Sequence, residues 1–526
     1  MFMRKISLLD CTLRDGGYVN DWMFGEDAIK GVGRKLAQAG IEFFEVGFIK
    51  GDTFNPNRAV FPDIQSMAQM IQPKEPDMIY VGMLDMSAPI PLDRLVPYDG
   101  TSVDGIRVIF KKAKIEEAYV YCKRIKELGY KLFVNFVGTD NYSDEEFVYG
   151  IEKFNDLEPF AMSIVDSFGL IRKKHFMRLV YLADNNMAPS ITLCYHAHNN
   201  LQQAFSNAES LVELNLKRDL CIDACVFGMG RGAGNLNEEL FAEFLNDNYD
   251  AHYKIEPMLE IMDEYLAEIY KEKFWGYSLP LYLSASTGCH PNYAIYLAEK
   301  DTLTVKSFNE LLKGIPSLDK TNFSKDKAEK YYKSYQDNFV DDTKTLDVLR
   351  SELLGKSILL LAPGKSVMEY EDEIKIEIAN NHSVVIALNY IGGKLTPDYI
   401  FSSNLRRYAK IKGKTEAKCI ITSNVKPNDE TEYVVNYSSF VSKEPDIIDN
   451  SGLMLIRLLA SIGVKSVSVA GMDGYSVFQK GDYVDESLEY QFSEGAARRN
   501  ELISTELVQL DKVIKIKFIT PTQYNY

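Results

Sequence analysis

The sequence predicts an α/β protein in which a (β/α)₈ TIM barrel is followed by a second, Rossmann-like α/β domain. Within the first 250 residues, eight short β-rich runs alternate with amphipathic stretches, as expected for strands joined by helices. A chain of 526 residues is too long for one hydrophobic core. A further set of apolar, strand-length runs begins near residue 356.

The barrel is predicted from the number and spacing of its elements. The strands expected are 6–9, 41–46, 78–84, 105–110, 131–137, 161–165, 191–195 and 221–227, and the helices expected between them are 26–39, 115–128, 144–154, 173–185, 201–214 and 237–246. The crossover 85–104 is rich in proline and poor in helix, so we expect an irregular unit there. Eight strands in this length favour a closed barrel over an open doubly wound sheet, which usually has fewer strands.

The chain is predicted to divide into four segments. Residues 1–250 form the barrel, and 251–304, which keep helical periodicity, form a helical annex. Residues 305–350 include the charged run "SKDKAEKYYKSYQDNF" and are expected to be a solvated helical connector. Residues 351–526 form the Rossmann-like domain, in which "NSGLMLIRLLASIG" predicts an apolar helix capped by Asn450 or Ser451.

Composition and charge exclude several classes of partner. The formal net charge of -16 argues against a nucleic acid or an anionic membrane surface. Seven cysteines without CxxC spacing indicate reduced core thiols. We find neither a secretory signal nor an apolar run of about 18 residues, so we expect a cytoplasmic protein without a membrane span.

Three polar motifs follow strands of the predicted barrel, where catalytic residues of this fold lie. Arg14 and Asp15 follow the first strand in "LRDGG", His196 and His198 follow the seventh in "YHAHNN", and the glycine loop "GMGRGAGN" follows the eighth. Residues i and i+2 of a strand point the same way, so both imidazoles are expected to project into one mouth that Asp15 reaches from across. Each motif alone has a simpler interpretation: a surface ion pair, two ordinary histidines, a glycine turn.

Together the motifs predict a divalent-cation site. Two imidazoles and carboxylate oxygens are suitable ligands for Mn²⁺, which we expect here, or for Mg²⁺, Co²⁺ or Zn²⁺. Other polar residues at or near strand ends are Glu45, Asn135 and Asp166. We expect Glu45 to orient Arg14, unless it is a surface carboxylate, and Asn135 and Asp166 to bind substrate.

The combination of "LLDCTLRDGG", "AGIEFFEVGF", "HAHNN" and "GMGRGAGN" resembles the DRE-TIM metallolyase superfamily, also called HMG-CoA lyase-like, over about residues 5–300. The family includes HMG-CoA lyase, isopropylmalate and homocitrate synthases, pyruvate carboxyltransferases and 4-hydroxy-2-oxoacid aldolases. The resemblance implies that Asp15, His196 and His198 are metal ligands. It also implies that Asn235 is a further ligand or lies next to the ligands, and that Arg14 stabilises an enolate oxygen.

These implied roles agree with the chemistry of an enolate. A divalent cation acts as a Lewis acid on the carbonyl oxygen of a 2-oxo acid, and a permanently cationic arginine adds charge at the same oxygen. Gly16 and Gly17 are expected to allow a tight turn and to leave space for substrate.

The sequence departs from the family where a base is expected. The hydroxy-oxoacid aldolases carry a histidine shortly after the Arg-Asp pair, whereas here the chain reads Gly17-Tyr18-Val19. Tyr18 has a high reference pKa and is a poor base, although it could relay a proton. His290 and Tyr293 in "GCHPNYAIY" are candidates to replace the histidine, and a packing role for His290 is equally open. The glycine loop also lacks the cysteine of HMG-CoA lyase, which disfavours HMG-CoA cleavage.

The C-terminal segment weakly resembles Rossmann-like domains of bacterial sialyltransferase-like proteins, through "LLLAPGKSV", "VIALNY", "PDYIFSSN" and "GVKSVSVAGMDG". The resemblance implies a nucleotide-sugar pocket lined by Gly364, Ser366, Asn389 and Asp473. A packing or dimerisation domain is the alternative. "APGKS" is not a Walker loop, because the first glycine is missing.

The leading functional hypothesis is a divalent-metal-dependent aldolase, or lyase, that acts on a small-molecule 2-oxo acid through a pyruvate-type enolate. The alternatives are a Claisen-type acyltransferase that uses an acyl-CoA and a 2-oxo acid, and a bifunctional surface-polysaccharide protein. Related barrels with helical annexes commonly dimerise, so the resemblance also implies a homodimer.

Overall fold

The computed structural model describes residues 4–51, 53–216, 218–300, 302–425, 432–476, 483–484 and 495–525, which form two compact units, residues 1–291 and 292–526. The boundary between the units falls within the predicted segment 251–304. Among the described residues, no helix has both the length and the apolar character needed to cross a bilayer.

The first unit is a closed barrel of eight parallel strands, which confirms the predicted fold. In chain order these strands are β1 (Ile6–Asp10), β2 (Phe43–Ile49), β4 (Ile79–Asp85), β5 (Gly105–Phe110), β6 (Lys131–Phe136), β7 (Ala161–Asp166), β8 (Thr192–Ala197) and β9 (Leu220–Ala224). Each strand pairs with its neighbour in the chain, and β1 pairs with both β9 and β2, which closes the barrel. A short additional strand, β3 (Val60–Phe61), lies beside β2 and was not predicted.

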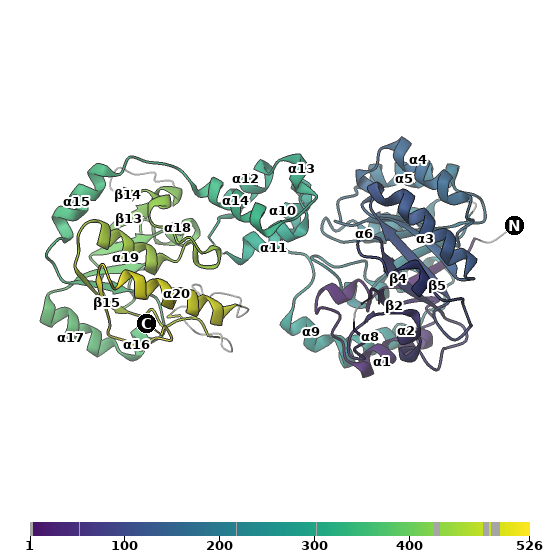
Figure 1. The fold of residues 1–526 in the computed structure, drawn as a ribbon, viewed down its shortest axis with the longest axis horizontal. Helices are drawn as coiled ribbons and strands as arrows, with labels where there is room; N and C mark the ends of the chain where they lie inside the picture. Colours follow the sequence, from purple (N-terminus) through teal and green to yellow (C-terminus); the bar gives the residue numbers. More distant parts are fainter. Residues whose placement is uncertain are drawn as a thin grey trace. The chain divides into compact units, whose positions relative to one another are not determined.

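Helices connect most of these strands and cover the barrel, as Figure 1 shows for α3, α4 and α5. Their bounds are α1 (Glu26–Ala39), α2 (Ile64–Met70), α3 (Ile115–Glu127), α4 (Asp144–Asn155), α5 (Lys173–Asn186), α6 (Ala204–Glu213) and α7 (Glu238–Tyr249). Local signals set several ends: Ser143 and Glu146 form a capping box at α4, and Gly40 ends α1 in the left-handed conformation. The crossover after β4 contains only one short 3₁₀ turn among its described residues, in agreement with the predicted irregular unit.

Strand β2 contains a bulge next to Glu45. The register between β2 and β4 shifts between Glu45 and Gly47, and all seven residues of β2 are buried. Gly47 has a φ of 156°, and a Cβ there would lie 2.2 Å from the Ala59 carbonyl oxygen. The bulge therefore requires glycine because another backbone segment approaches closely.

Helices α8 (Glu256–Ile261), α9 (Ala267–Glu272) and α10 (Leu279–Thr287) complete the first unit. Five residues between α8 and α9 form a π-helical turn. The first helices of the second unit are α11 (Pro291–Glu299), whose Pro291 belongs to the first unit, α12 (Val305–Gly314), α13 (Ser317–Lys320), α14 (Lys325–Gln336) and α15 (Thr343–Leu353).

The core of the second unit is a seven-stranded parallel sheet with the order β14-β13-β12-β11-β10-β15-β16, which confirms a second α/β domain. The strands are β10 (Ile358–Leu361), β11 (Val384–Leu388), β12 (Tyr399–Ser402), β13 (Lys418–Thr422), β14 (Tyr433–Val435), β15 (Ser466–Ala470) and β16 (Lys515–Phe518). Residues of α15, α19 (Ser451–Ser461) and α20 (Ala496–Leu510) share one buried cluster, and residues of α16 (Ser366–Glu369), α17 (Glu371–Asn381) and α18 (Leu405–Ile411) share another. The strand order reverses at β10, as in doubly wound folds.

Candidate metal centre and active site

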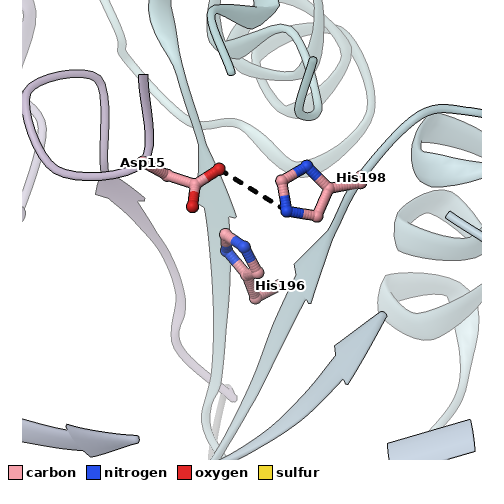
Figure 2. Close-up of side chains that lie close together, drawn as sticks. All are labelled: Asp15, His196 and His198. Carbon is pink, nitrogen blue, oxygen red and sulfur yellow. Dashed lines mark ion pairs between the residues drawn. The ribbon is translucent and has the colours of Figure 1, made fainter. Parts of the chain in front are cut away.

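Three side chains that are far apart in the sequence converge at the carboxyl ends of the barrel strands. Asp15 lies in the turn between β1 and the 3₁₀ helix η1 (Gly16–Tyr18), His196 is on β8, and His198 follows that strand. One potential ligand atom from each lies within 4.8 Å of the others, and all three residues are buried. Figure 2 shows Asp15 and His198 pointing toward one another, with His196 alongside. The i, i+2 spacing of the histidines accounts for their common direction.

The available atoms of these residues suit a divalent cation. Nδ1 of His196 lies 3.1 Å from Oδ2 of Asp223, which leaves Nε2 available. Nε2 of His198 lies 3.6 Å from Oδ2 of Asp15. Asn235 donates through Nδ2 to Oδ2 of Asp15 at 2.7 Å, while its buried Oδ1 has no hydrogen-bond partner among the described residues. Two imidazole nitrogens, a carboxylate and an unsatisfied amide oxygen therefore fit a cation site.

The protonation states at this site also favour cation binding. Burial by itself raises the pKa of Asp15, but His198 and Arg14 outweigh it and hold the pKa well below its ordinary value. Burial lowers the pKa of His198 to about 4, because the charged imidazolium is poorly solvated there. Asp15 is thus an anion and His198 a neutral imidazole at neutral pH, which are the forms that bind metals.

Arg14 is held beside Asp15 by two ion pairs. Its Nε donates to Oε2 of Glu45 at 2.7 Å, and its Nη1 donates to Oδ1 of Asp15 at 2.6 Å. Burial opposes the charge on Arg14, but Glu45 and Asp15 raise its pKa well above the ordinary value, so the guanidinium stays cationic. Glu45 is fully buried, so it is not a surface carboxylate.

Two further charged residues support the site, and our sequence analysis missed both. Arg107 on β5 is fully buried, and it contacts Asp223 on β9 at 2.6 Å and Glu45 at 3.3 Å. A chain of alternating charges therefore runs from Arg14 through Glu45 and Arg107 to Asp223, whose carboxylate contacts Nδ1 of His196. The sequence did contain a signal for both residues, because each is a charged residue inside an otherwise apolar strand. Arg107 lies in "GIRVIF" and Asp223 in "LCIDA".

The two glycines after Asp15 are explained by protein packing. A Cβ on Gly17 would lie 2.0 Å from Cδ1 of Trp22, and one on Gly16 would lie 3.0 Å from Met229 in the glycine loop. Nε1 of Trp22 donates to the carbonyl oxygen of Arg14 at 2.7 Å. Space that we expected for substrate at Gly17 is therefore filled by Trp22, which fixes the Arg-Asp turn.

Asn135 and Asp166 are both buried, and the side-chain oxygens of both have hydrogen-bond partners within the chain. Oδ1 of Asn135 on β6 accepts from Oγ of Ser163 at 2.9 Å. The two carboxylate oxygens of Asp166 accept from the backbone amides of Leu170 and Ile171 at 2.8 and 2.9 Å. Burial raises the pKa of Asp166 to about 7. These hydrogen bonds give Asp166 a role in holding the loop after β7.

The three candidate bases lie in different surroundings. Burial raises the pKa of Tyr18, so its hydroxyl is neutral and a poor base. Burial, together with Arg231, lowers the pKa of His290 to about 4, and its ring lies 4.9 Å from that of Phe168.

Tyr293 belongs to the second unit. Its hydroxyl donates to the carbonyl oxygens of Asp319 and Asn322, at 3.2 and 3.3 Å, in that same unit. Its hydroxyl is thus engaged by backbone carbonyls of its own unit.

The residues predicted in the C-terminal domain lie at the carboxyl ends of its strands. Gly364, Asn389 and Asp473 line one cleft, which also includes Arg407. The backbone amide of Ser366 donates to Asp473 at 2.8 Å, so the amide expected to meet a phosphate is taken by a carboxylate of the chain. A Cβ on Gly364 would lie 2.2 Å from the carbonyl oxygen of Gly471, which explains the glycine.

Fold and site together define the class of the first unit: a (β/α)₈ barrel with a candidate Asp-His-His metal centre at the carboxyl ends of its strands. Residues 5–263 match the HMGL-like family model, and this part of the chain belongs to the HMGL-like family. The resemblance found in the N-terminal sequence is confirmed; the resemblance of the C-terminal segment stays a prediction.

Individual relatives are distant. The chain is 24% identical to the 4-hydroxy-2-oxovalerate aldolase of Carboxydothermus hydrogenoformans over 281 residues, which cover 50% of this chain and 78% of the relative. It is 23% identical to the oxaloacetate decarboxylase of Mycobacterium tuberculosis, over 45% of this chain and 68% of the relative. Among solved structures, it is similar to the hydroxymethylglutaryl-CoA lyase of Pseudomonas aeruginosa, with 16% identity and a TM-score of 0.41 over 49% of this chain and 91% of that chain.

Proposed function

We propose that the barrel unit is a divalent-cation-dependent aldolase that makes or breaks a carbon–carbon bond of a 2-oxo acid through a pyruvate-type enolate. The observation that carries the proposal is the convergence of Asp15, His196 and His198, with the cationic Arg14 directly beside Asp15. Names of the curated relatives support it, since several are 4-hydroxy-2-oxovalerate aldolases.

In this proposal the metal ligands are Asp15, His196 and His198, with Asn235 as a fourth through Oδ1. A bound cation, with Mn²⁺ as our first choice and Mg²⁺, Co²⁺ or Zn²⁺ as alternatives, supplies Lewis acidity toward the 2-oxo acid.

The protein's own residues provide the rest of the chemistry. Arg14, fixed by Glu45, donates hydrogen bonds to the enolate oxygen as negative charge develops there. We assign the base that accepts the proton of the C4 hydroxyl to His290, which is a neutral imidazole at neutral pH, although its pKa of about 4 makes it a weaker base than a free imidazole. Because burial raises the pKa of Tyr18, its hydroxyl keeps the proton and acts as a hydrogen-bond donor instead of as the base. Tyr293 has no role in this proposal.

The test is hydrogen exchange at the methyl group of pyruvate in deuterium oxide, followed by proton NMR. The protein loaded with Mn²⁺ is expected to exchange methyl protons for deuterium, and EDTA is expected to stop the exchange, which Mn²⁺ then restores. This assay detects enolate formation without knowledge of the second substrate. No exchange with any of the four cations contradicts the proposal, and release of thiol from acetyl-CoA without pyruvate exchange supports the acyltransferase alternative.

We propose a second function for the C-terminal unit: binding of a nucleotide sugar in the cleft at the ends of β10, β11, β12 and β15. The supporting observation is position, because ligands of doubly wound sheets bind outside the carboxyl ends of the strands where the strand order reverses. Full-length protein is expected to show a higher thermal midpoint with a CMP-, UDP- or GDP-sugar, and Arg407→Met is expected to remove the shift. No shift with any of them contradicts this proposal.

A further inference from the structure

Arg231 lies at the mouth of the barrel and takes no part in the charge chain described above. It sits in the glycine loop after β9, and its guanidinium lies 4.1 Å from the centre of the Tyr18 ring. Tyr18 is the last residue of η1, three positions after Asp15, so Arg231 stands close to the metal centre. The loop around it is braced, since the Gly234 amide donates to the Arg231 carbonyl oxygen at 3.1 Å.

No acidic side chain among the described residues forms an ion pair with Arg231. The residue is half-buried and stacked on an aromatic ring, which holds the guanidinium in place without neutralising it. Two carboxylates, Asp15 and Asp85, contribute to the raised pKa of Tyr18. Neither pairs with Arg231, because Asp15 is paired with Arg14 and Asp85 accepts a hydrogen bond from the Ser87 amide at 2.7 Å. A charged group fixed at a site's mouth with its donors still available suits an anionic ligand.

The positive charge at this position extends beyond one residue. After burial, Arg231 and Lys111 are the next causes that lower the pKa of His290, so both cations lie near that imidazole. Arg231 also contributes to the lowered pKa of His198. Lys111 directly follows β5, so the two cations come from loops after different strands of the same barrel mouth.

The charge of Arg231 is more than a 2-oxo acid needs for its own carboxylate. A cation held by Asp15, His196 and His198 would, together with Arg14, already provide the positive charge for the carboxylate and carbonyl at one end of such a substrate. We infer that Arg231 binds a second anionic group, a carboxylate or a phosphate, carried on the part of the substrate beyond C4. This inference rests on the proposed aldolase function and narrows its substrate class.

The reaction that this assigns is the cleavage of a 4-hydroxy-2-oxo acid that has a second anionic group. The bond between C3 and C4 breaks, and the C4 hydroxyl gives its proton to the base. The electron pair of the broken bond passes into the enolate of the 2-oxo acid product, which then takes a proton at C3. C4 and the carbons beyond it leave as an aldehyde that carries the anion held by Arg231.

A matched pair of substrates tests the inference. 4-Hydroxy-2-oxoglutarate and 4-hydroxy-2-oxovalerate have the same five-carbon chain, and they differ only in having a carboxylate or a methyl group at C5. For a phosphate, the corresponding pair is glycolaldehyde phosphate and glycolaldehyde, each condensed with pyruvate. In one of these pairs the wild-type kcat/KM is expected to favour the anionic member by at least about 10-fold, and Arg231→Met is expected to reduce that ratio by about 10- to 100-fold.

The exposed Arg124→Met on helix α3 is the matched control and is expected to keep the ratio of the wild type. A wild-type ratio near one in both pairs overturns the inference, and so does an equal loss for both members in Arg231→Met, which would assign Arg231 to the 2-oxo carboxylate. If the wild type incorporates deuterium into the methyl group of pyruvate but does not prefer the anionic substrate, the aldolase proposal stands and only the proposed anion subsite is wrong. If the wild type incorporates no deuterium, both the aldolase proposal and the anion subsite are wrong.

Discussion

Replacing Asp15 with asparagine is expected to lower the rate of pyruvate deuterium exchange by about 10³-fold, which corresponds to several kcal/mol of charge stabilisation. The amide keeps the shape of the side chain but removes the negative charge that faces His198 and Arg14. The affinity for Mn²⁺, measured by calorimetry, is expected to fall together with the exchange rate.

Asp247→Asn is the matched control for this variant, because Asp247 is exposed on helix α7. It is expected to leave both Mn²⁺ affinity and exchange at wild-type values. Tryptophan fluorescence checks the fold of the Asp15 variant. An Asp15→Asn protein that binds Mn²⁺ as tightly as the wild type would exclude Asp15 as a ligand.

Replacing Arg107 with methionine is expected to lower the free energy of unfolding of the barrel unit by about 3–5 kcal/mol. The substitution leaves the carboxylates of Glu45 and Asp223 buried without their shared cation. Urea denaturation followed by tryptophan fluorescence measures this effect, since the two tryptophans of the chain, Trp22 and Trp275, both lie in the first unit.

Two variants make this result interpretable. Arg124→Met removes an exposed arginine whose pairing with Glu127 is 3.7 Å long, and it is expected to change the free energy of unfolding by less than about 0.5 kcal/mol. Adding Glu45→Gln and Asp223→Asn to Arg107→Met removes the unpaired charges and is expected to restore part of the lost stability. If Arg107→Met is as stable as the Arg124→Met control, the buried charge chain does not support the fold.

Much of the barrel could be predicted because its signals are local. Strand-length apolar runs alternate with helical periods, and a predicted helix such as 26–39 matches α1 (Glu26–Ala39) at both ends, where Gly40 stops it. The short strand β3 was missed because a two-residue strand has no period to detect. The π-helical turn in the predicted helical segment 251–304 was missed because it does not change the amphipathic pattern.

The candidate site could be predicted in part for a different reason. Asp15, His196 and His198 stand out because they are polar residues at the ends of apolar strands. Arg107 and Asp223 lie inside strands, and nothing in their local sequence shows that they face each other across the barrel. Gly17 is likewise explained only by Trp22, five residues further on, whose ring fills the space beside it.

The order of the amino acids alone specifies the alternation of strands and helices, the order of the polar strand ends and the common direction of the two histidines. These features follow from backbone periodicity and from which side chains are apolar. The tertiary structure alone decided which buried charges meet, that Asp166 and Asp473 accept from backbone amides of their own chain, and that Arg231 lies over Tyr18. Such pairings depend on distances between segments that are far apart in the chain, and closure of the sheet sets those distances.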